Sequence, residues 1–242
     1  MIRKVTNSEK HGNDHISILF PGNAIDHSDT GIGSIGRIDQ ASILGGTTIK
    51  MHPHINDEIL SYFRIGHVMH TDSEQNSEVI SRKKLMLMKA GKLFYHQEHM
   101  LDHLEGLQIF IRPQTKDYTP EVIFYDLENE NSINTWRFLA SNNAKTKIQF
   151  TSETEIYDIQ IDNNEIYKIP VSELKNTTSI LYVFQGSIIV NNEFSLIKGE
   201  CIIFDENQIS FNTNSTAELV LFITNKNQVC FKDGMFSGNQ KI

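Results

Sequence analysis

The chain has 242 residues, of which 39% are hydrophobic and 21% are charged, an ordinary balance for a folded globular protein. Its 30 acidic residues outnumber its 22 lysines and arginines, so the formal net charge is -8 at pH 7. An acidic chain whose one compact basic run is 82–84 is poorly suited to neutralising phosphates. We therefore expect no direct binding to nucleic acid.

The N-terminal segment 1–15 contains no apolar core of signal-peptide length, and no segment approaches the ~20 apolar residues that span a bilayer. Cys201 and Cys230 lie far apart in strand-like sequence, which does not indicate a disulfide framework. Buried thiols in a reducing compartment are the expectation. We predict a cytoplasmic protein without a membrane partner.

The first half of the chain is predicted to consist of short strands. Residues 34–52 alternate apolar and polar side chains between glycines, as half-buried strands do. Residues 58–73 are typical of two strands that meet near Gly66 and end in a polar turn. Residues 84–98 and 106–113 continue the same pattern.

The second half repeats this character after a polar connection. Residues 114–152 are mixed in composition, and we interpret them as the crossover between two halves. Within them, 133–141 is compatible with a strand or a short helix. From 155 to 224, short apolar segments recur between Gly, Asn and Asp residues. This spacing predicts an all-β barrel or sandwich.

The two halves also resemble each other. Residues 59–73 and 180–194 each consist of an apolar strand, a glycine, a second apolar strand and a polar turn. Residues 84–98 and 196–210 follow them at similar distances. Histidines occur in the first copy only. We therefore expect chemistry in the first half and a structural role for the second.

Two segments of the first half carry a metal-binding pattern. Side chains two apart in a strand project from the same face, so His52 and His54 point together, while Pro53 between them points away. His96 and Glu98 have the same spacing about forty residues later. If the two strands pair inside a barrel, three imidazoles and one carboxylate converge. Such a set suits a first-row divalent metal and leaves open positions for a substrate or dioxygen.

With these residues in view, the sequence resembles the pirin family of the cupin superfamily. The pattern G-x5-H-x-H-x3-E-x7-G over 46–66 is similar to the first cupin motif, with one additional residue before the last glycine. Residues 72–73, 90–98 and 106–113 match further pirin signatures in order and spacing. Residues 180–204 resemble the histidine-free second cupin of that family.

The resemblance implies a bicupin, that is, two tandem cupin β-barrels. Residues 1–125 would form the metal-binding N-terminal cupin, and residues 126–242 a degenerate C-terminal cupin without metal. The ligands of the family fall on four positions: His52, His54, His96 and Glu98. The resemblance implies one divalent metal ion, with iron first and Mn, Ni, Co, Cu or Zn as alternatives.

Two functions follow from the same resemblance. Several pirins have quercetin 2,3-dioxygenase activity, which implies a small aromatic substrate with Glu98 as both ligand and base. Some eukaryotic members act instead as nuclear cofactors of transcription, which implies a non-enzymatic, metal-binding regulatory or adaptor protein with a protein partner. Bulky side chains at 93–95 that fill the cavity would favour the second function.

The remaining candidates are placed outside the ligand set. Glu58 stays open between orienting a ligand imidazole and being a solvated loop carboxylate. His67 and His70 have a spacing that prevents them from sharing one face of a hairpin, and both are expected at the surface. His99 and His103 are expected in a loop. Nothing in the sequence connects three further histidines to the site: His11, His15 and His27.

Overall fold

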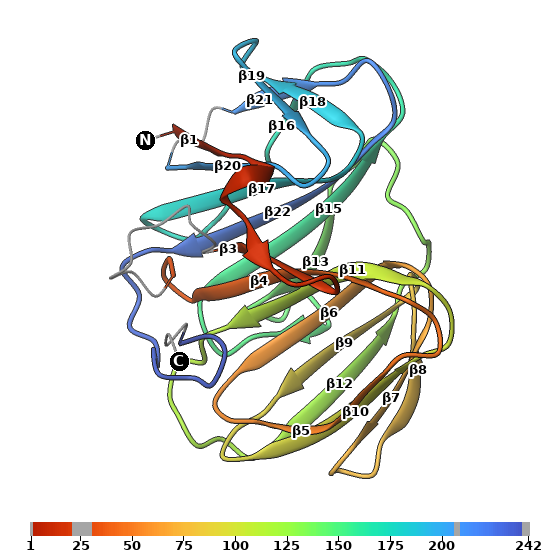
Figure 1. The fold of residues 1–242 in the computed structure, drawn as a ribbon. Coiled ribbons are helices and arrows are strands. Elements are labelled where there is room, and N and C mark those ends of the chain that lie inside the picture. Colours follow the sequence, from red (N-terminus) through yellow and green to blue (C-terminus); the bar gives the residue numbers. More distant parts are fainter. Residues whose placement is uncertain (1, 21–30, 206–208, 239–242) are drawn as a thin grey trace. The chain divides into compact units, whose positions relative to one another are not determined.

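The computed structural model describes residues 2–20, 31–205 and 209–238 (Figure 1). Over these ranges the chain consists of β-strands, turns and one short 3₁₀ helix, Asn7–Glu9 (η1), so the predicted all-β class is confirmed. No helix in these ranges has the length and apolar character that a bilayer span requires. His27 lies outside the described residues.

The described residues form two compact units, each with its own core. The N-terminal unit comprises Lys10–Glu130, Phe150–Ser152 and Val229–Ile242. The C-terminal unit comprises Met1–Glu9, Asn131–Gln149 and Glu153–Gln228. Each unit therefore includes segments from distant parts of the sequence, and the two are described separately below.

The N-terminal unit contains one seven-stranded and one four-stranded sheet. In spatial order, the larger sheet consists of β12 (Glu121–Asp126), β9 (Lys84–Lys89), β6 (Glu58–Ile65), β11 (Leu104–Ile111), β4 (Ile35–Ile43), β3 (Ile16–Phe20) and β2 (His11–Gly12). The smaller sheet consists of β5 (Thr48–His54), β10 (Phe94–Met100), β7 (Val68–Asp72) and β8 (Ser77–Ile80).

The C-terminal unit repeats this arrangement of seven and four strands. Its larger sheet consists of β1 (Ile2–Val5), β20 (Cys201–Phe204), β17 (Thr177–Gln185), β22 (Ala217–Asn225), β15 (Thr154–Ile161), β13 (Arg137–Ser141) and β14 (Ile148–Gln149). Its smaller sheet consists of β16 (Tyr167–Lys168), β21 (Ser210–Asn212), β18 (Ser187–Val190) and β19 (Phe194–Ile197).

The internal repeat predicted from the sequence is therefore visible in the strands. β6 and β7 are separated by Gly66, and β17 and β18 by Gly186, with φ angles of 82° and 80° that favour glycine. The segment that was compatible with a strand or a helix is a strand, β13. Cys201 is buried as expected, whereas Cys230 is only partly buried.

The sheets of the N-terminal unit enclose an apolar core in which the metal-binding pattern is embedded. Strand β10 alternates strictly, with Phe94, His96, Glu98 and Met100 buried. Two polar side chains thus take inward positions that apolar ones occupy elsewhere along the strand. The core around them is formed mainly by Ile59, Phe63, Val68, Met86, Met88, Leu104 and Phe110. Burying each of these large side chains contributes on the order of 1.5–3 kcal/mol.

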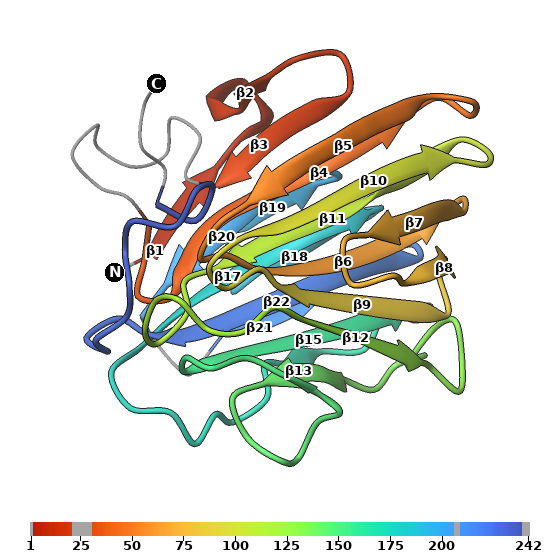
Figure 2. The same cartoon turned by 90° about the horizontal axis from the view of Figure 1, so that it is seen from below.

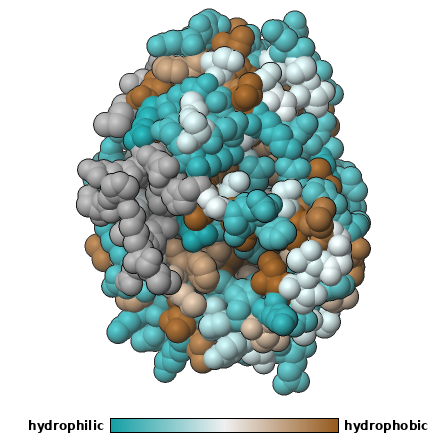
Figure 3. Space-filling model, in the orientation of Figure 1, coloured by the Kyte–Doolittle hydropathy of each residue, from teal (hydrophilic) through white to brown (hydrophobic). Residues whose placement is uncertain are grey.

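Strands β5 and β10 lie side by side in the smaller sheet, and β7 flanks β10 on its other edge (Figure 2). Exposed apolar side chains are scattered among hydrophilic ones on the face that Figure 3 shows. Such scattering is ordinary for a protein surface. The polar residues buried inside the N-terminal unit are therefore the more informative feature.

Candidate metal centre

Strand pairing brings the two histidine segments together. β5 and β10 are antiparallel, with His96 opposite His52 and Phe94 opposite His54. Because His52 and His54 are two apart, they share the face on which His96 projects. His54 and His96 are buried, with exposed fractions of 4% and 1%, while His52 is partly exposed. The predicted pairing of these strands inside a barrel is present.

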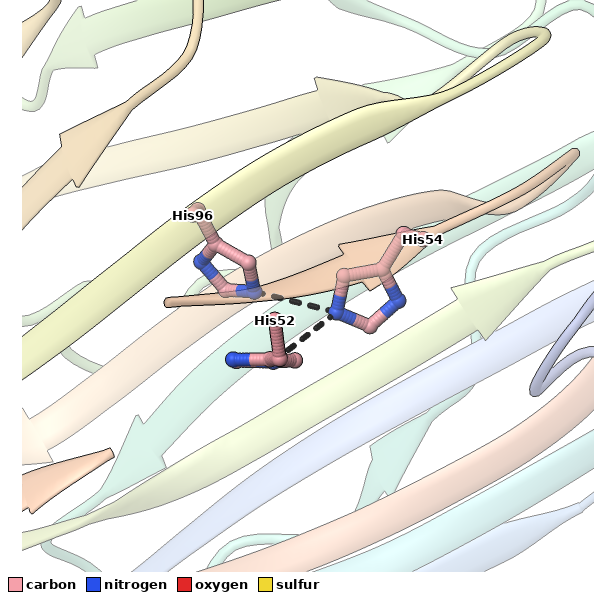
Figure 4. A group of neighbouring side chains, drawn as sticks. All are labelled: His52, His54 and His96. Carbon is pink, nitrogen blue, oxygen red and sulfur yellow. Dashed lines mark hydrogen bonds between the residues drawn. The ribbon is translucent and has the colours of Figure 1, made fainter. Parts of the chain in front are cut away.

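The three imidazoles converge through one nitrogen each (Figure 4). The Nε2 atom of His54 lies 3.2 Å from Nε2 of His52 and 3.0 Å from Nε2 of His96. On its other edge, the Nδ1–H of His52 donates to the Lys50 carbonyl at 2.8 Å. This hydrogen bond fixes the tautomer of His52 and leaves its Nε2 lone pair facing the cluster.

The spacing of these nitrogens fits a shared cation. Histidine nitrogens bind zinc at about 2.0–2.1 Å, so two of them at ligand angles near 90–110° are roughly 2.8–3.4 Å apart. The observed separations of 3.0 and 3.2 Å fall in this interval. Three facing lone pairs cannot all be satisfied by hydrogen bonds among neutral rings, because each ring has a single N–H. A divalent cation would satisfy all three.

Burial favours the neutral form of His96 and His52, which is the form that metal binding requires. It lowers the pKa of His96 to about 2, with a further contribution from the nearby imidazoles. Burial likewise lowers the pKa of His52. Because metal ligands must be neutral imidazoles, these two rings are available for a cation without first losing a proton.

Glu98, the fourth predicted ligand, lies at the other edge of the His96 ring. Its Oε1 atom is 3.9 Å from Nδ1 of His96, and it forms a group with His96 and His70 whose ligand atoms all lie within 4.8 Å of one another. Gln108 donates its amide to both carboxylate oxygens, at 3.3 and 3.2 Å. Burial raises the pKa of Glu98 to about 7.

The prediction of a surface position is wrong for His70. His67 is exposed and paired with Asp102, as expected for a surface histidine, but His70 is fully buried in β7. It lies opposite Glu98 where β7 pairs with β10. The odd spacing does place His67 and His70 on opposite faces of the sheet, but one of those faces is the interior. The H-x-D pattern at 70–72 parallels H-x-E at 96–98 and was the available signal.

Asp57 was also missed, although it follows the histidine pair closely. It is buried, and its Oδ2 atom lies 3.6 Å from Nδ1 of His54. Its two oxygens accept the backbone N–H groups of Phe236 and Ser237, at distances between 2.9 and 3.2 Å. One carboxylate therefore connects the histidine segment to residues near the C-terminus, about 180 positions away.

That connection places an aromatic wall beside the histidines. The Phe236 ring lies 5.0 Å from the His54 ring and stacks on Phe110 at 5.4 Å between centroids. The Arg37 guanidinium lies 5.6 Å from the centre of the Phe236 ring. Opposite His54 in the strand pair, Phe94 is fully buried. The surroundings of the three imidazoles are therefore aromatic on more than one side.

The other candidates lie apart from the three imidazoles. Glu58 begins β6, is 1% exposed and accepts the Thr151 N–H through both oxygens, so the solvated-loop alternative is wrong. Strand β10 extends through His99, where a loop was expected, and His103 is exposed. His15 is exposed, and nothing is described for the side chain of His11.

Known proteins show the same fold and a related sequence. The family model described as Pirin matches residues 6–111. A quercetin 2,3-dioxygenase of Escherichia coli O157:H7 is 26% identical over 206 residues, covering 83% of this chain and 86% of the relative. A pirin-like protein of Arabidopsis thaliana is 26% identical over 163 residues, covering 62% and 52%.

Among solved structures, the bacterial pirin YhhW from Escherichia coli, in complex with nickel(II), has a TM-score of 0.77 at 22% identity. The match covers 93% of this chain and 99% of that one. This similarity is one of fold and extends over nearly the whole of both chains. It confirms the predicted architecture of two tandem cupin barrels.

Proposed function

Because the chain belongs to the pirin family of the cupin superfamily, we propose that it is a metal-dependent dioxygenase of the quercetin 2,3-dioxygenase type. Relatives over most of its length carry that name, and a pirin of the same fold is known with nickel(II). The observation that carries the proposal is the convergence of three Nε2 atoms, from His52, His54 and His96, within one aromatic-lined interior.

We assign the proposed metal site to the four predicted ligands His52, His54, His96 and Glu98, of which the three imidazoles form one group and Glu98 lies in a second group with His96. One divalent ion would occupy it in the N-terminal cupin, 1–125, with iron as the first choice and Mn, Ni, Co, Cu or Zn as alternatives. The C-terminal cupin, 126–242, would have a structural role and bind no metal. A cation held by these groups would act as a Lewis acid that lowers the pKa of a coordinated substrate hydroxyl.

The protein's own groups account for proton transfer and substrate orientation. Glu98 is suited to accept a proton from a substrate hydroxyl that the cation makes more acidic, and Gln108 holds its carboxylate in place. Phe236 and Phe110 present stacked aromatic rings beside His54, against which a flat aromatic substrate would pack. His52, the most exposed of the three imidazoles, marks the side from which a substrate would approach.

The test is oxygen consumption with a flavonol. Protein loaded separately with Fe, Mn, Ni, Co or Cu is incubated aerobically with quercetin, and both oxygen uptake and release of carbon monoxide are measured. We expect turnover with at least one metal and none in the His54→Ala variant. Absence of turnover with all five metals, in protein shown to contain one ion per chain, contradicts the flavonol proposal.

A specific surface feature supports the second candidate, a metal-binding adaptor protein. Of the three bulky side chains at 93–95 only Phe94 faces the interior, so together they do not fill the cavity; Leu93 and Tyr95 are 44% and 40% exposed, and the support comes from this exposed pair. Met51 and Ile55, on and beside β5, are similarly exposed. Recovery of one stable protein partner that is lost in a Tyr95→Glu variant with normal metal content would favour this candidate. A catalytic role alone predicts no such dependence on Tyr95.

A further inference from the structure

The residues that follow His54 hold a segment near the C-terminus, 229–238, within the N-terminal unit. Strand β5 ends at His54, and the carbonyl of Ile55, directly after it, accepts the Met235 N–H at 2.9 Å. The end of the strand that carries two of the proposed ligands is therefore also part of the docking site of this C-terminal segment.

Asp57 connects the C-terminal segment to the proposed ligand itself. Its oxygens accept the backbone N–H groups of Phe236 and Ser237, and its Oδ2 atom lies 3.6 Å from Nδ1 of His54. That nitrogen is buried and has no hydrogen-bond partner among the residues that the structure describes. The side chains of His54 and Asp57 are at most 5% exposed, so water and salt screen their interaction little.

The C-terminal segment is held by separate contacts rather than by a sheet. None of its residues, all of which the structure describes, lies in a strand. Besides the bonds given above, the Phe231 N–H donates to the Pro113 carbonyl, and Arg112 donates to the Ser237 carbonyl. Val229, at its start, is 87% exposed. Segments of this kind open locally at a low cost in free energy.

A cation on His54 would strengthen the hold of Asp57. When Nε2 of a neutral imidazole holds a metal ion, the single N–H of the ring is on Nδ1, which here faces Asp57. The charge of the ion makes this N–H more positive and attracts the carboxylate. Asp57 is then held from one side by the ring, in the position in which its oxygens accept the two N–H groups of the C-terminal segment.

We propose that docking of the C-terminal segment is coupled through Asp57 to occupation of the metal site. The segment is held tightly in the metal-bound protein and opens more often in the metal-free protein. This inference rests on the metal ion of the proposed function, although not on the dioxygenase reaction. Because the Phe236 ring lies beside His54 and stacks on Phe110, each opening removes one aromatic wall of the site.

Hydrogen–deuterium exchange measures this coupling without catalysis. Peptides that cover 229–238 are followed by mass spectrometry in metal-free protein and in protein saturated with Zn²⁺. We expect Zn²⁺ to slow exchange in the C-terminal segment by roughly 5–150-fold, the usual range of coupling between two sites. Strand β3, 16–20, pairs with β2 and β4 and takes no hydrogen bond from Asp57, so it should exchange equally in both states.

Gly234→Ala tests the reverse direction of the coupling. An added Cβ would overlap the Asn56 carbonyl oxygen and Oδ1 of Asp57, so the C-terminal segment should undock. Its exchange should be fast with and without Zn²⁺. Because coupling is reciprocal, the affinity for Zn²⁺ should fall, by no more than the factor by which Zn²⁺ slows exchange in the wild type. Val229→Ala, which changes an exposed side chain of the same segment, should behave like the wild type.

Asp57→Asn tests the connection itself. It removes the charge that faces His54, so Zn²⁺ at saturation should no longer slow exchange in the C-terminal segment. Circular dichroism verifies that each variant is folded. If Asp57→Asn does not fold, the exchange of the wild type and of Gly234→Ala decides.

The outcomes separate this inference from the proposed function. A wild type that binds one Zn²⁺ per chain, with unchanged exchange in 229–238, overturns the coupling and leaves the metal site standing. Equal slowing in 229–238 and in 16–20 overturns it as well, because ligand binding then stabilises the whole unit alike. If the wild type binds no Zn²⁺, the metal site fails and the coupling fails with it.

Discussion

His96 lies directly opposite His52, and the pairing of β5 with β10 shifts register immediately afterwards, so that Glu98 lies opposite Ile49. Strand β5 therefore contains one more residue than β10 over this interval, and the neighbours Lys50 and Met51 are both exposed there. Such irregularities re-aim side chains and backbone groups. Here the result is a Lys50 carbonyl that accepts the Nδ1–H of His52 and orients it.

The first prediction concerns the imidazole at the centre of the cluster. His54→Ala removes the nitrogen that is nearest to both other Nε2 atoms. Loss of an outer partner of a ligand costs roughly 10–100-fold in metal affinity, and loss of the ligand itself should cost more than about 100-fold. Affinity is measured by competition with a chromogenic chelator.

The control for this measurement is His99→Ala, which removes a partly exposed histidine of the same strand pair whose Nδ1 bonds to Thr48. It should bind metal like the wild type. Equal affinities of the His54→Ala protein and the wild type would show that the three imidazoles do not hold the ion.

The sequence was sufficient for the fold class and for the three imidazoles. Alternation in 48–54 and 94–100 follows directly from the period of a strand, so the shared face of His52 and His54 could be predicted before any pairing was known. The apolar residues around them predicted an interior location. The repeat of 59–73 in 180–194 likewise predicted two similar units.

Long-range contacts could not be predicted in this way. The position of Glu98 depends on the register shift, which leaves no signature in the alternation. The burial of His70 depends on which strand flanks β10. The hydrogen bonds of Asp57 to Phe236 and Ser237 depend on the return of the C-terminal segment to the first unit. The alternation of a strand shows which side chains share a face, but the pairing with neighbouring strands determines which residues those side chains contact.

The second prediction tests the buried Asp57. Asp57→Asn keeps the shape but removes the charge that faces Nδ1 of His54 and accepts two backbone N–H groups. Hydrogen bonds to a charged group are worth about 1.5–3 kcal/mol, so the free energy of unfolding should fall by roughly that amount. Metal affinity should fall about 10–100-fold. Urea unfolding and chelator competition measure the two effects.

A matched variant is Asp102→Asn, which alters the exposed His67–Asp102 pair. Because this pair is exposed and screened by solvent, the stability of the variant should change little and its metal affinity not at all. If Asp57→Asn loses stability but binds metal with wild-type affinity, Asp57 anchors the C-terminal segment without acting on His54.

The third prediction concerns the turn that leads into β10. Gly91 has φ of 52°, and an added Cβ would overlap the Tyr118 carbonyl oxygen. The same glycine accepts the Asn56 N–H, next to Asp57. A left-handed conformation costs other residues about 1–2 kcal/mol, and the overlap with the backbone adds to this cost. The free energy of unfolding of Gly91→Ala should therefore fall by more than about 2 kcal/mol. At Gly46, φ is 81° and an added Cβ would meet no atom within 4 Å. The free energy of unfolding of Gly46→Ala should therefore fall only by the cost of the left-handed conformation. If thermal unfolding shows equal losses of stability for Gly91→Ala and Gly46→Ala, the overlap at Gly91 does not contribute.

The fourth prediction is a pH dependence set by Glu58. Burial raises the pKa of this carboxyl from 4.5 to about 7 in the folded protein. The folded state therefore binds the proton more tightly than the unfolded chain. The stability that Glu58 contributes is fully present below pH 4.5 and is lost as the pH rises through about 7. A pKa difference of this size corresponds to roughly 3 kcal/mol.

Glu58→Gln isolates this contribution, because glutamine has a similar shape and does not titrate. The free energy of unfolding of the wild type minus that of Glu58→Gln should decrease by roughly 3 kcal/mol between about pH 4.5 and pH 8. Other titrating groups, including Glu98, are common to both proteins and cancel in the difference. Urea unfolding of both proteins at several pH values measures it. A difference that stays constant over this range would mean that Glu58 is ionised in the folded protein, stabilised by the Thr151 N–H and by Lys89 on the neighbouring strand.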